Sequence, residues 1–329
     1  MPALCRLSVA LTILVSVLVA GVPSSAQSPQ AARDWPTRPV RLILPLGPAS
    51  GADITARMLA DRLSVRWGQP VIVENKPGGD AILAINTVLN AHDDHVLLYS
   101  PTSSFLAHPL LHAKVPYDVN DLQPIARTTT TLIGMAVPTS LGVTTLKDFV
   151  AKVRAAPGKL NFASATGAND LVFASFLKTE NLNMSKVPYR DPVQPITDLA
   201  EGRVQAYVGA YAILRPQIEG GKVRMLALTN PMPAASLPGM PTADAAGYKA
   251  LTIDGLAGIF GPRGMPLPLR ERIAADVCDV LADKTIVERL TGVGLVVSPG
   301  GPADLAAGIA DQRQTVKRVG DILQLTPEQ

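Results

Sequence analysis

Short apolar runs alternate with amphipathic stretches along the chain, and this alternation predicts an α/β protein. Residues 40–45, 71–74 and 96–100 are short, mostly apolar runs, as expected of strands buried on both faces. Apolar side chains recur at helical spacing between these runs, over 54–67 and 81–91. Strands and helices in this order predict a parallel sheet with helical crossovers.

The same order continues through the rest of the chain. Further strands are predicted at 132–137, 160–164, 186–189, 204–210, 225–229 and 251–260, and further helices at 146–158, 169–179, 192–201, 269–282 and 303–319. A chain of 329 residues exceeds the usual size of one core, so two domains or one large α/β unit are expected.

The first residues have the composition of a secretory signal peptide. Arg6 precedes an apolar stretch at 7–20, and small residues follow up to Ala26. This stretch is shorter than the ~20 residues that span a bilayer, and no later run approaches that length. We therefore expect cleavage after Ala26 and an exported, soluble mature protein.

Charge and cysteine content narrow the function classes. Lys and Arg number 30 and Asp and Glu 27, and loss of Arg6 with the signal leaves 29 − 27 = +2. No basic cluster interleaves with aromatic residues, so nucleic-acid binding is not indicated. Without Cys5 no intramolecular disulfide can form, and Cys278, beside an apolar helical stripe, is predicted to be a buried packing residue rather than a reactive thiol.

Three loops of small residues follow predicted strands, at 46–53, 101–104 and 165–169. Helices that follow parallel strands begin at the carboxyl edge of the sheet, where open α/β folds bind ligands. Free N–H groups and the helix dipole there favour an anion. The alternative for the first loop is an ordinary turn with Ser50 or Asp53 as the N-cap, and the local sequence leaves both open. The loop matches neither GxGxxG nor a Walker motif, so nucleotide binding is not expected.

Catalytic motifs are scarce. His108 and His112 stand four apart, but a proline lies between them and no Glu follows the first, so a structural role is favoured over a metal site. His92 and His95 flank two aspartates in a predicted turn, where a solvated loop is expected. Gly-x-Ser-x-Gly is absent, and no nucleophile–base pair emerges. No catalytic residue, metal or cofactor is therefore predicted, which disfavours an enzyme.

The segment "WPTRPVRLILPLGPASGADITARMLADRLSVRWGQPVIVENKPGG", residues 35–79, closely resembles the amino-terminal signature of the tripartite tricarboxylate transporter receptors, the Bug family of extracytoplasmic solute-binding proteins. The resemblance continues in order through the mature chain. It includes "VPYDVNDLQPIA" (115–126), "PGKLNFAS" (157–164), "VPYR" (187–190), "GGKVRMLALT" (220–229) and "LPGMPTADAAGY" (237–248).

This resemblance implies a two-lobed, periplasmic-binding-protein-like (type II) α/β fold. Each lobe would hold a mixed, mostly parallel sheet flanked by helices, with hinge strands between the lobes. The signal peptide would be 1–26, the first lobe 34–136 plus 256–329, and the second lobe 137–255.

The family's function implies a periplasmic, non-enzymatic and monomeric receptor for a small carboxylate: an organic, amino or aromatic acid. The receptor would serve the permease subunits of a tripartite tricarboxylate transporter or a membrane sensor. Loops of both lobes would hold the ligand. The implied ligand-binding residues are Ala49, Ser50, Gly51, Asp53, Thr102 and Ser103 in the first lobe, and Thr166, Gly167, Ala168, Asn169, Gly209 and Ala210 in the second.

Three acidic positions leave alternatives open. If Asp170 and Asp191, which depart from the family pattern, face the cleft, each repels a ligand carboxylate by about 4 kcal/mol at 4 Å and an effective dielectric constant of 20. A ligand with a single carboxylate would follow. Alternatively, Asp170 serves a first helical turn and Asp191 caps a helix. Asp53 either caps its helix or also touches a ligand hydroxyl or ammonium group.

Two rival functions remain. One is an exported α/β hydrolase or lyase acting on a small carboxylic acid. The other is a receptor-like scaffold that has lost its ligand, since the loops depart from the family pattern.

Overall fold

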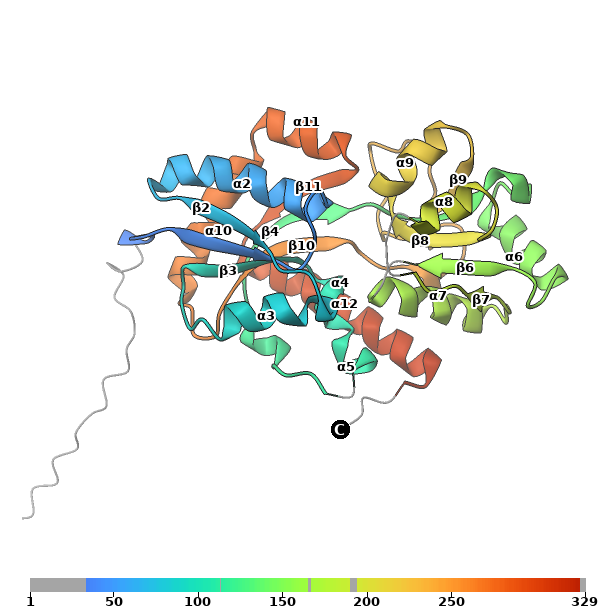
Figure 1. Ribbon diagram of the computed structural model, residues 1–329, viewed down its shortest axis with the longest axis horizontal. Coiled ribbons are helices and arrows are strands. Elements are labelled where there is room, and N and C mark those ends of the chain that lie inside the picture. The colour runs from blue at the N-terminus through green and yellow to red at the C-terminus, as the bar shows by residue number, and fades with distance from the viewer. Residues whose placement is uncertain (1–33, 113, 165–166, 190–193, 326–329) are drawn as a thin grey trace, which may run out of the picture.

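The computed structural model describes residues 34–112, 114–164, 167–189 and 194–325. The predicted signal peptide, Thr166 and Asp191 lie outside the described residues. Figure 1 shows two lobes side by side, each built on its own sheet. This is the two-lobed α/β fold that the sequence predicts.

The first sheet has the strand order β11-β4-β10-β3-β1-β2. Its strands are β1 (Val40–Leu44), β2 (Val71–Asn75), β3 (Val96–Pro101), β4 (Gln123–Thr131), β10 (Leu256–Gly261) and β11 (Leu295–Gly300). β1 is parallel to β2 and β3, whereas β10 is antiparallel to β3 and β4, and β11 is antiparallel to β4. The parallel strands β1 and β3 therefore carry the two first-lobe loops that were predicted to bind ligand.

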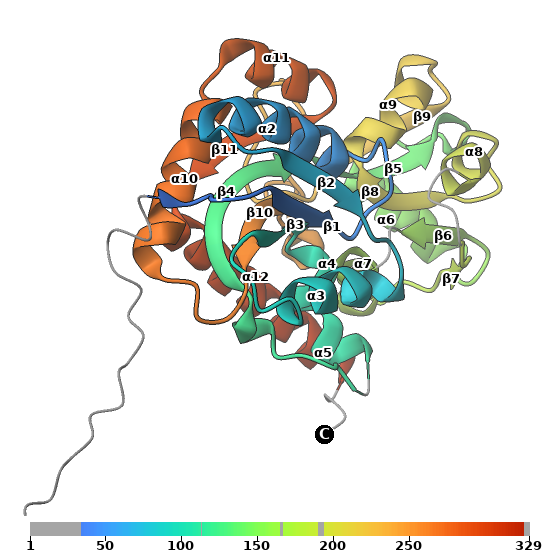
Figure 2. The same ribbon diagram turned by 60° about the vertical axis from the view of Figure 1, so that its left-hand side comes forward.

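Helices cover both faces of the first sheet (Figure 2). The apolar side chains of α2 (Gly51–Trp67), α10 (Leu267–Leu281) and α11 (Lys284–Gly292) pack on one face. Those of α3 (Ile82–Leu89), α4 (Ser103–Leu106) and α12 (Pro302–Leu323) pack on the other. The short α5 (His108–Leu111) follows α4.

The second sheet has the order β7-β6-β8-β5-β9. Its strands are β5 (Ile133–Pro138), β6 (Asn161–Ser164), β7 (Ser185–Lys186), β8 (Ala206–Ala210) and β9 (Val223–Leu228). One face is covered by α6 (Leu146–Ala155) and α7 (Ala168–Thr179), and the other by α8 (Gln194–Ala200) and α9 (Tyr211–Glu219). The sheets are more evenly mixed than "mostly parallel": among the described strands, four pairings are parallel and five antiparallel.

The chain crosses between the lobes on segments that lie against one another. The N–H of Thr131 donates to the Gly255 carbonyl at 2.9 Å, and a Cβ atom on Gly255 would lie 2.1 Å from the Thr131 oxygen. Asn230, 3% exposed, accepts from the N–H of Ile133 at 2.8 Å and donates to the Thr131 carbonyl at 2.9 Å. Residues 133–136, which the predicted boundary places in the first lobe, form part of β5 in the second sheet.

Helix α12 belongs to both lobes. Leu305 near its start packs in the core of the first lobe, whereas Val319 near its end packs in the α6–α7 core of the second.

Among the described residues, no helix is long and apolar enough to cross a membrane. Cys278 was predicted to be buried, but the structure shows it half-buried. Burial raises the pKa of its thiol, and the nearby Asp279 and Asp304 carboxylates raise it further.

Candidate ligand-binding site

The loop between β1 and α2 is closed by a side-chain cap. Ser50 is the N-cap of α2, and its Oγ accepts the N–H of Asp53 at 3.2 Å. Ala49 before it lies in the left-handed region, with φ 64°. Of the two cap residues that the sequence left open, Ser50 is therefore the one used.

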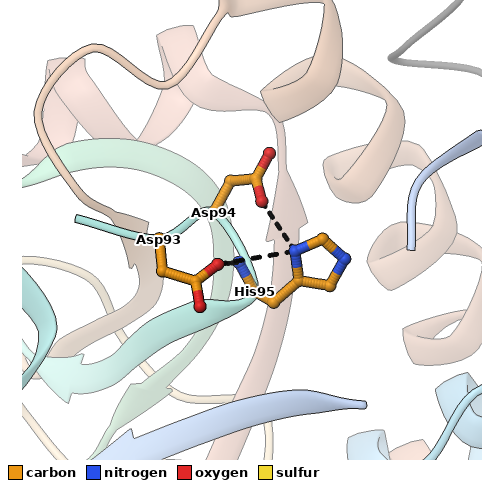
Figure 3. Close-up of side chains that lie close together, drawn as sticks. All are labelled: Asp93, Asp94 and His95. Atoms are coloured by element: carbon orange, nitrogen blue, oxygen red, sulfur yellow. Dashed lines mark hydrogen bonds and ion pairs between the residues drawn. The ribbon is translucent and has the colours of Figure 1, made fainter. Parts of the chain in front are cut away.

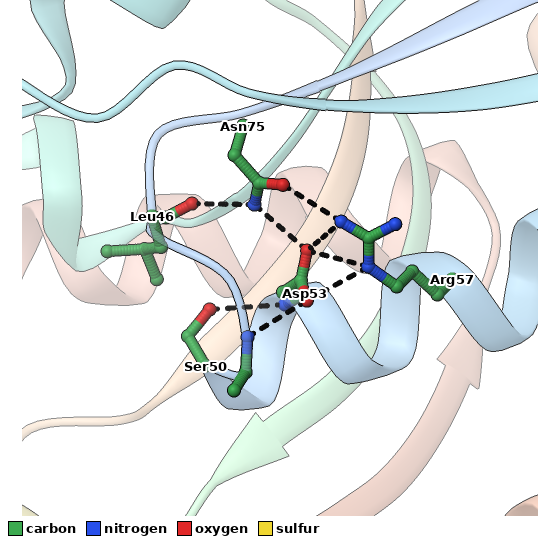
Figure 4. Close-up of polar contacts among 6 residues, drawn as sticks. Leu46, Ser50, Asp53, Arg57 and Asn75 are labelled. Atoms are coloured by element: carbon green, nitrogen blue, oxygen red, sulfur yellow. Dashed lines mark hydrogen bonds and ion pairs between the residues drawn. The ribbon is translucent and has the colours of Figure 1, made fainter.

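Asp53 is an internal anchor of this loop (Figure 4). It is 3% exposed and accepts the N–H of Ala49 at 3.0 Å, the Nδ2 of Asn75 at 2.9 Å and the Nε of Arg57 at 3.0 and 3.1 Å. Burial favours the neutral acid, but these hydrogen bonds and the Arg57 charge outweigh burial and lower the pKa of Asp53. The Ala49 N–H, predicted to be open to a ligand, is occupied by this carboxylate.

The start of α2 still offers donors to a ligand. Gly51 and Ala52 are the first two helical residues, so their N–H groups have no acceptor within the helix. Gly51 lies against Leu295 of β11: a Cβ atom at position 51 would come within 3.3 Å of that side chain. A glycine therefore lets the helix start close to the sheet.

The two residues predicted after β3 behave differently. Thr102 is fully buried, and its hydroxyl lies 3.0 Å from the Leu256 carbonyl and contacts the Oε1 of Gln312. These contacts are structural and leave little of the hydroxyl for a ligand. Ser103, in contrast, begins α4 and is half-buried.

The loop that precedes α7 meets the first lobe. Gly167 is the N-cap of α7, with φ 76° and ψ −140°, and no side chain caps the helix there. A Cβ atom on Gly167 would lie 3.3 Å from the carbonyl oxygen of Ser103. Ala168 is buried in the same core cluster as Ala107 of the first lobe. The structure thus brings together two loops that the sequence predicted to face each other.

Two side chains at the start of α7 differ in their hydrogen bonding. The Oδ1 atom of Asn169 is buried and has no hydrogen-bond partner among the described residues. Asp170 accepts from the Ser164 hydroxyl at 2.7 Å and pairs with the Lys186 Nζ at 2.5 Å. Because Asp170 is neutralised within its own lobe, it gives no reason to exclude a ligand with two carboxylates.

Gly209 and Ala210 end β8 at the edge of the second sheet where β6 also ends, because β6 and β8 are parallel neighbours. Gly209 is required by packing: a Cβ atom there would lie 2.4 Å from the ring of Tyr207. Ala210 is the N-cap of α9 and has no side-chain cap. The carboxyl ends of β6 and β8 therefore lie side by side at one edge of the second sheet.

Two cavities lie away from these loops. A groove of about 650 Å³ between α10 and α12 is lined by residues that include Arg270 and Cys278. A smaller one of about 320 Å³ lies beside α9 and β9. Neither is lined by the predicted ligand residues, so the candidate site rests on the loop geometry and not on a cavity.

Among the described residues, one group has the geometry to hold a metal ion: Asp93, Asp94 and His95 (Figure 3). His92 is exposed, as expected of a solvated loop, but His95 is only 6% exposed, so the expectation was wrong for His95. Its Nε2 accepts the N–H of Thr37 at 3.2 Å, which places the ring proton on Nδ1, 2.6 Å from Asp94. Asp93 binds Arg38 at 2.7 Å. The group thus anchors the segment before β1 and lacks a free nitrogen lone pair for a metal.

His108 also has a structural environment. It is buried, its Nδ1 lies 2.5 Å from the Tyr117 hydroxyl, and its ring packs edge-on against His112 with centroids 5.1 Å apart.

Two further residues that organise the candidate site were not predicted, Arg57 and Asn75. The signal for Asn75 was its place in the "ENKPGG" part of the amino-terminal signature.

Two lobes joined by crossing segments, with small-residue loops that meet between them, form the fold of periplasmic solute-binding proteins. A family model described as "Tripartite tricarboxylate transporter family receptor" matches residues 55–325, and the chain belongs to this family. The chain is 27% identical to the protein BugT of Bordetella pertussis over 292 residues, 87% of this chain and 90% of that protein.

Solved structures agree with the fold. A periplasmic transporter is 25% identical, with a TM-score of 0.78, over 89% of this chain and 99% of that one. An R. palustris protein solved with adipate, Rpa4515, is 24% identical, with a TM-score of 0.78 over the same shares. The resemblance found in the sequence is confirmed.

Proposed function

We propose that the chain is a periplasmic receptor that captures a small carboxylate between its lobes. It would deliver the ligand, as a monomer, to the permease subunits of a tripartite tricarboxylate transporter or to a membrane sensor. The observation that carries this proposal is the meeting of the Ser103 and Gly167 loops, one from each lobe. Family membership and the adipate found with a structural neighbour support it.

The proposal divides the predicted site residues into two groups. Ser50, Gly51, Ser103, Thr166, Gly167, Ala168, Asn169, Gly209 and Ala210 stay proposed ligand contacts. Ala49, Asp53 and Thr102 are proposed to hold their loops in place, because their polar groups are occupied within the first lobe. With residues 133–136 moved to the second lobe, a first lobe of 34–132 plus 256–329 and a second lobe of 133–255 are parts of the proposal, as is cleavage after Ala26.

Closure of the lobes would couple ligand capture to delivery. A ligand that contacts loops of both lobes binds the closed form more tightly than the open one and shifts the population towards closure. The permease or sensor would then recognise the closed form. Because Lys186 neutralises Asp170, mono- and dicarboxylates are both candidate ligands.

A ligand screen on the mature protein tests the proposal. Protein unfolded and refolded to remove carried ligand is titrated with adipate, malate, glutamate and benzoate, and with adipamide as the uncharged control. At least one acid should raise the melting temperature, and adipamide should not. If none of a broad acid panel does, the ligandless scaffold is correct. If NMR shows the bound acid being converted on prolonged incubation, the chain is an enzyme.

A further inference from the structure

The conformation of the β1–α2 loop is fixed by a side chain outside it. Asn75 ends β2, where it lies beside Leu44 at the end of β1. Its Nδ2 donates to the Leu46 carbonyl at 2.9 Å and to the Asp53 Oδ1 at 2.9 Å. Its Oδ1 accepts from the Nη2 of Arg57 at 3.0 Å. One amide group therefore bonds to the first residue of the loop and to the helix that ends it (Figure 4).

These bonds extend to the tip of the loop. The same Asp53 carboxylate that Asn75 contacts accepts the N–H of Ala49 at 3.0 Å, so the tip is tied to the helix start. Ala49 is exposed and has a positive φ, a conformation that alanine adopts only when other contacts hold it. The loop is thus held at its beginning, its tip and its end.

The chemistry requires an amide at position 75. Two donated hydrogens and one accepting oxygen match a carbonyl, a carboxylate and a guanidinium at once. Aspartate has the same shape but cannot donate, and it would place a second negative charge beside Asp53. Alanine removes all three bonds and leaves the Leu46 carbonyl without its side-chain partner.

We propose that Asn75 is a positioning residue that presets the β1–α2 loop, and with it the Gly51 and Ala52 N–H groups, for a ligand carboxylate. The affinity part of this proposal rests on the proposed function. A loop that is already ordered loses less conformational entropy on binding. If loss of Asn75 lowers the population of the competent loop to roughly a tenth, the apparent Kd rises roughly tenfold.

The test compares Asn75→Asp with Asn90→Asp, which makes the same chemical change at an exposed residue at the end of α3. Amide NMR signals of residues 46, 47 and 49–52 in the ligand-free protein report the loop, and adipate titration reports affinity. In Asn75→Asp the Ala49 and Gly51 signals should shift or broaden, and binding should weaken roughly tenfold. Saturating adipate should restore the signals. Amide signals outside the loop should keep their wild-type positions without ligand, which a general loss of stability would not allow.

Wild-type signals in Asn75→Asp, or changes equal to those in Asn90→Asp, overturn the proposal. Asn75→Ala, which adds no charge, replaces Asn75→Asp if that variant does not fold. If the wild type binds no carboxylate, the proposed function fails, and the ligand-free loop signals still decide whether Asn75 orders the loop.

Discussion

The carbonyl oxygen of Ser103 lies 3.3 Å from the place where a side chain on Gly167 would begin. The two residues belong to different lobes, so this contact joins the lobes in this structure. It also lies between the two loops that we propose to hold the ligand. Any side chain at position 167 would therefore affect lobe closure and binding together.

Replacing Gly167 by alanine should destabilise the protein and weaken carboxylate binding. The φ of 76° and ψ of −140° belong to a region almost confined to glycine, and strain there costs about 1–3 kcal/mol. The new methyl group also crowds Ser103. Thermal unfolding and adipate titration measure both effects. Gly142→Ala is the control, because Gly142 also has a positive φ, 74°, but faces open space. Equal affinity in the two variants would remove the Ser103 contact from the binding mechanism.

A second contact joins the lobes between α9 and α11. The Nη1 of Arg215 donates to the carbonyl of Gly292 at 2.5 Å, and a Cβ atom on Gly294 would lie 3.0 Å from the Tyr211 ring. Figures 1 and 2 both place α9 and α11 at the top of the molecule and α4 and α7, which make the first contact, below them. The lobes are therefore held at two separated places.

Arg215→Gln should favour the open form. Loss of the bond to Gly292 removes one of the contacts that join the two lobes in this structure. Small-angle X-ray scattering of the ligand-free variant should give a larger radius of gyration than the wild type, and adipate should reduce the difference. Arg224→Gln, at an exposed arginine of β9, is the charge-matched control and should leave the radius unchanged. The same radius in all three proteins would show that the Arg215 bond does not bias closure.

The apolar pattern predicted β1, β3 and β8 well because their side chains are buried on both faces. It missed β4, whose sequence ends in four threonines. Thr128 and Thr129 are buried and lie 3.1 and 3.3 Å from the Tyr99 hydroxyl, so a polar stretch forms a central strand. This hydrogen bonding joins residues that are distant in sequence, and a periodicity of apolar positions cannot report it.

In the candidate site too, local features could be predicted from the sequence, whereas contacts between distant residues could not. The Ser50 cap could be predicted because a cap is a local signal. The contact between Asn75 and Asp53 could not, because 22 positions separate the two residues and only the parallel pairing of β1 and β2 brings them together. The predicted free N–H of Ala49 was lost for the same reason: its acceptor is the carboxylate that this pairing orients.

Asp53→Asn should destabilise the protein by about 2 kcal/mol, because charge-assisted hydrogen bonds to Arg57 are lost. The amide that replaces the carboxylate also points a donor at one of the groups that now donate to Asp53. Urea unfolding at neutral pH measures the change. Asp61→Asn, an exposed aspartate on the same helix, is the control. A destabilisation no larger than that of the control would show that Asp53 does not anchor the loop.

Asp53 and a second aspartate, Asp254, should affect stability with opposite dependence on pH. Burial raises the pKa of Asp254, although the Asn230 amide, 3.3 Å away, partly offsets it. A raised pKa in the folded protein means that the stabilisation is complete below the ordinary pKa of aspartate, about 4, and is lost as the pH rises through the folded value. Asp254→Asn should therefore be more stable than the wild type at pH 8 and lose this advantage towards pH 4.

The lowered pKa of Asp53 gives the reverse sign. Its stabilisation is present above the ordinary pKa of aspartate and is lost as the pH falls through the folded value, so the deficit of Asp53→Asn should shrink in acid. Urea unfolding of both variants and the wild type between pH 2 and pH 8 resolves the two trends, because the Asp53 effect changes below the ordinary pKa of aspartate and the Asp254 effect above it. Asp244→Asn, at an exposed aspartate, supplies the baseline. Parallel curves for Asp53→Asn and Asp254→Asn would mean that at least one of the two carboxyl groups does not differ from its ordinary pKa in the direction that its hydrogen bonds and burial require.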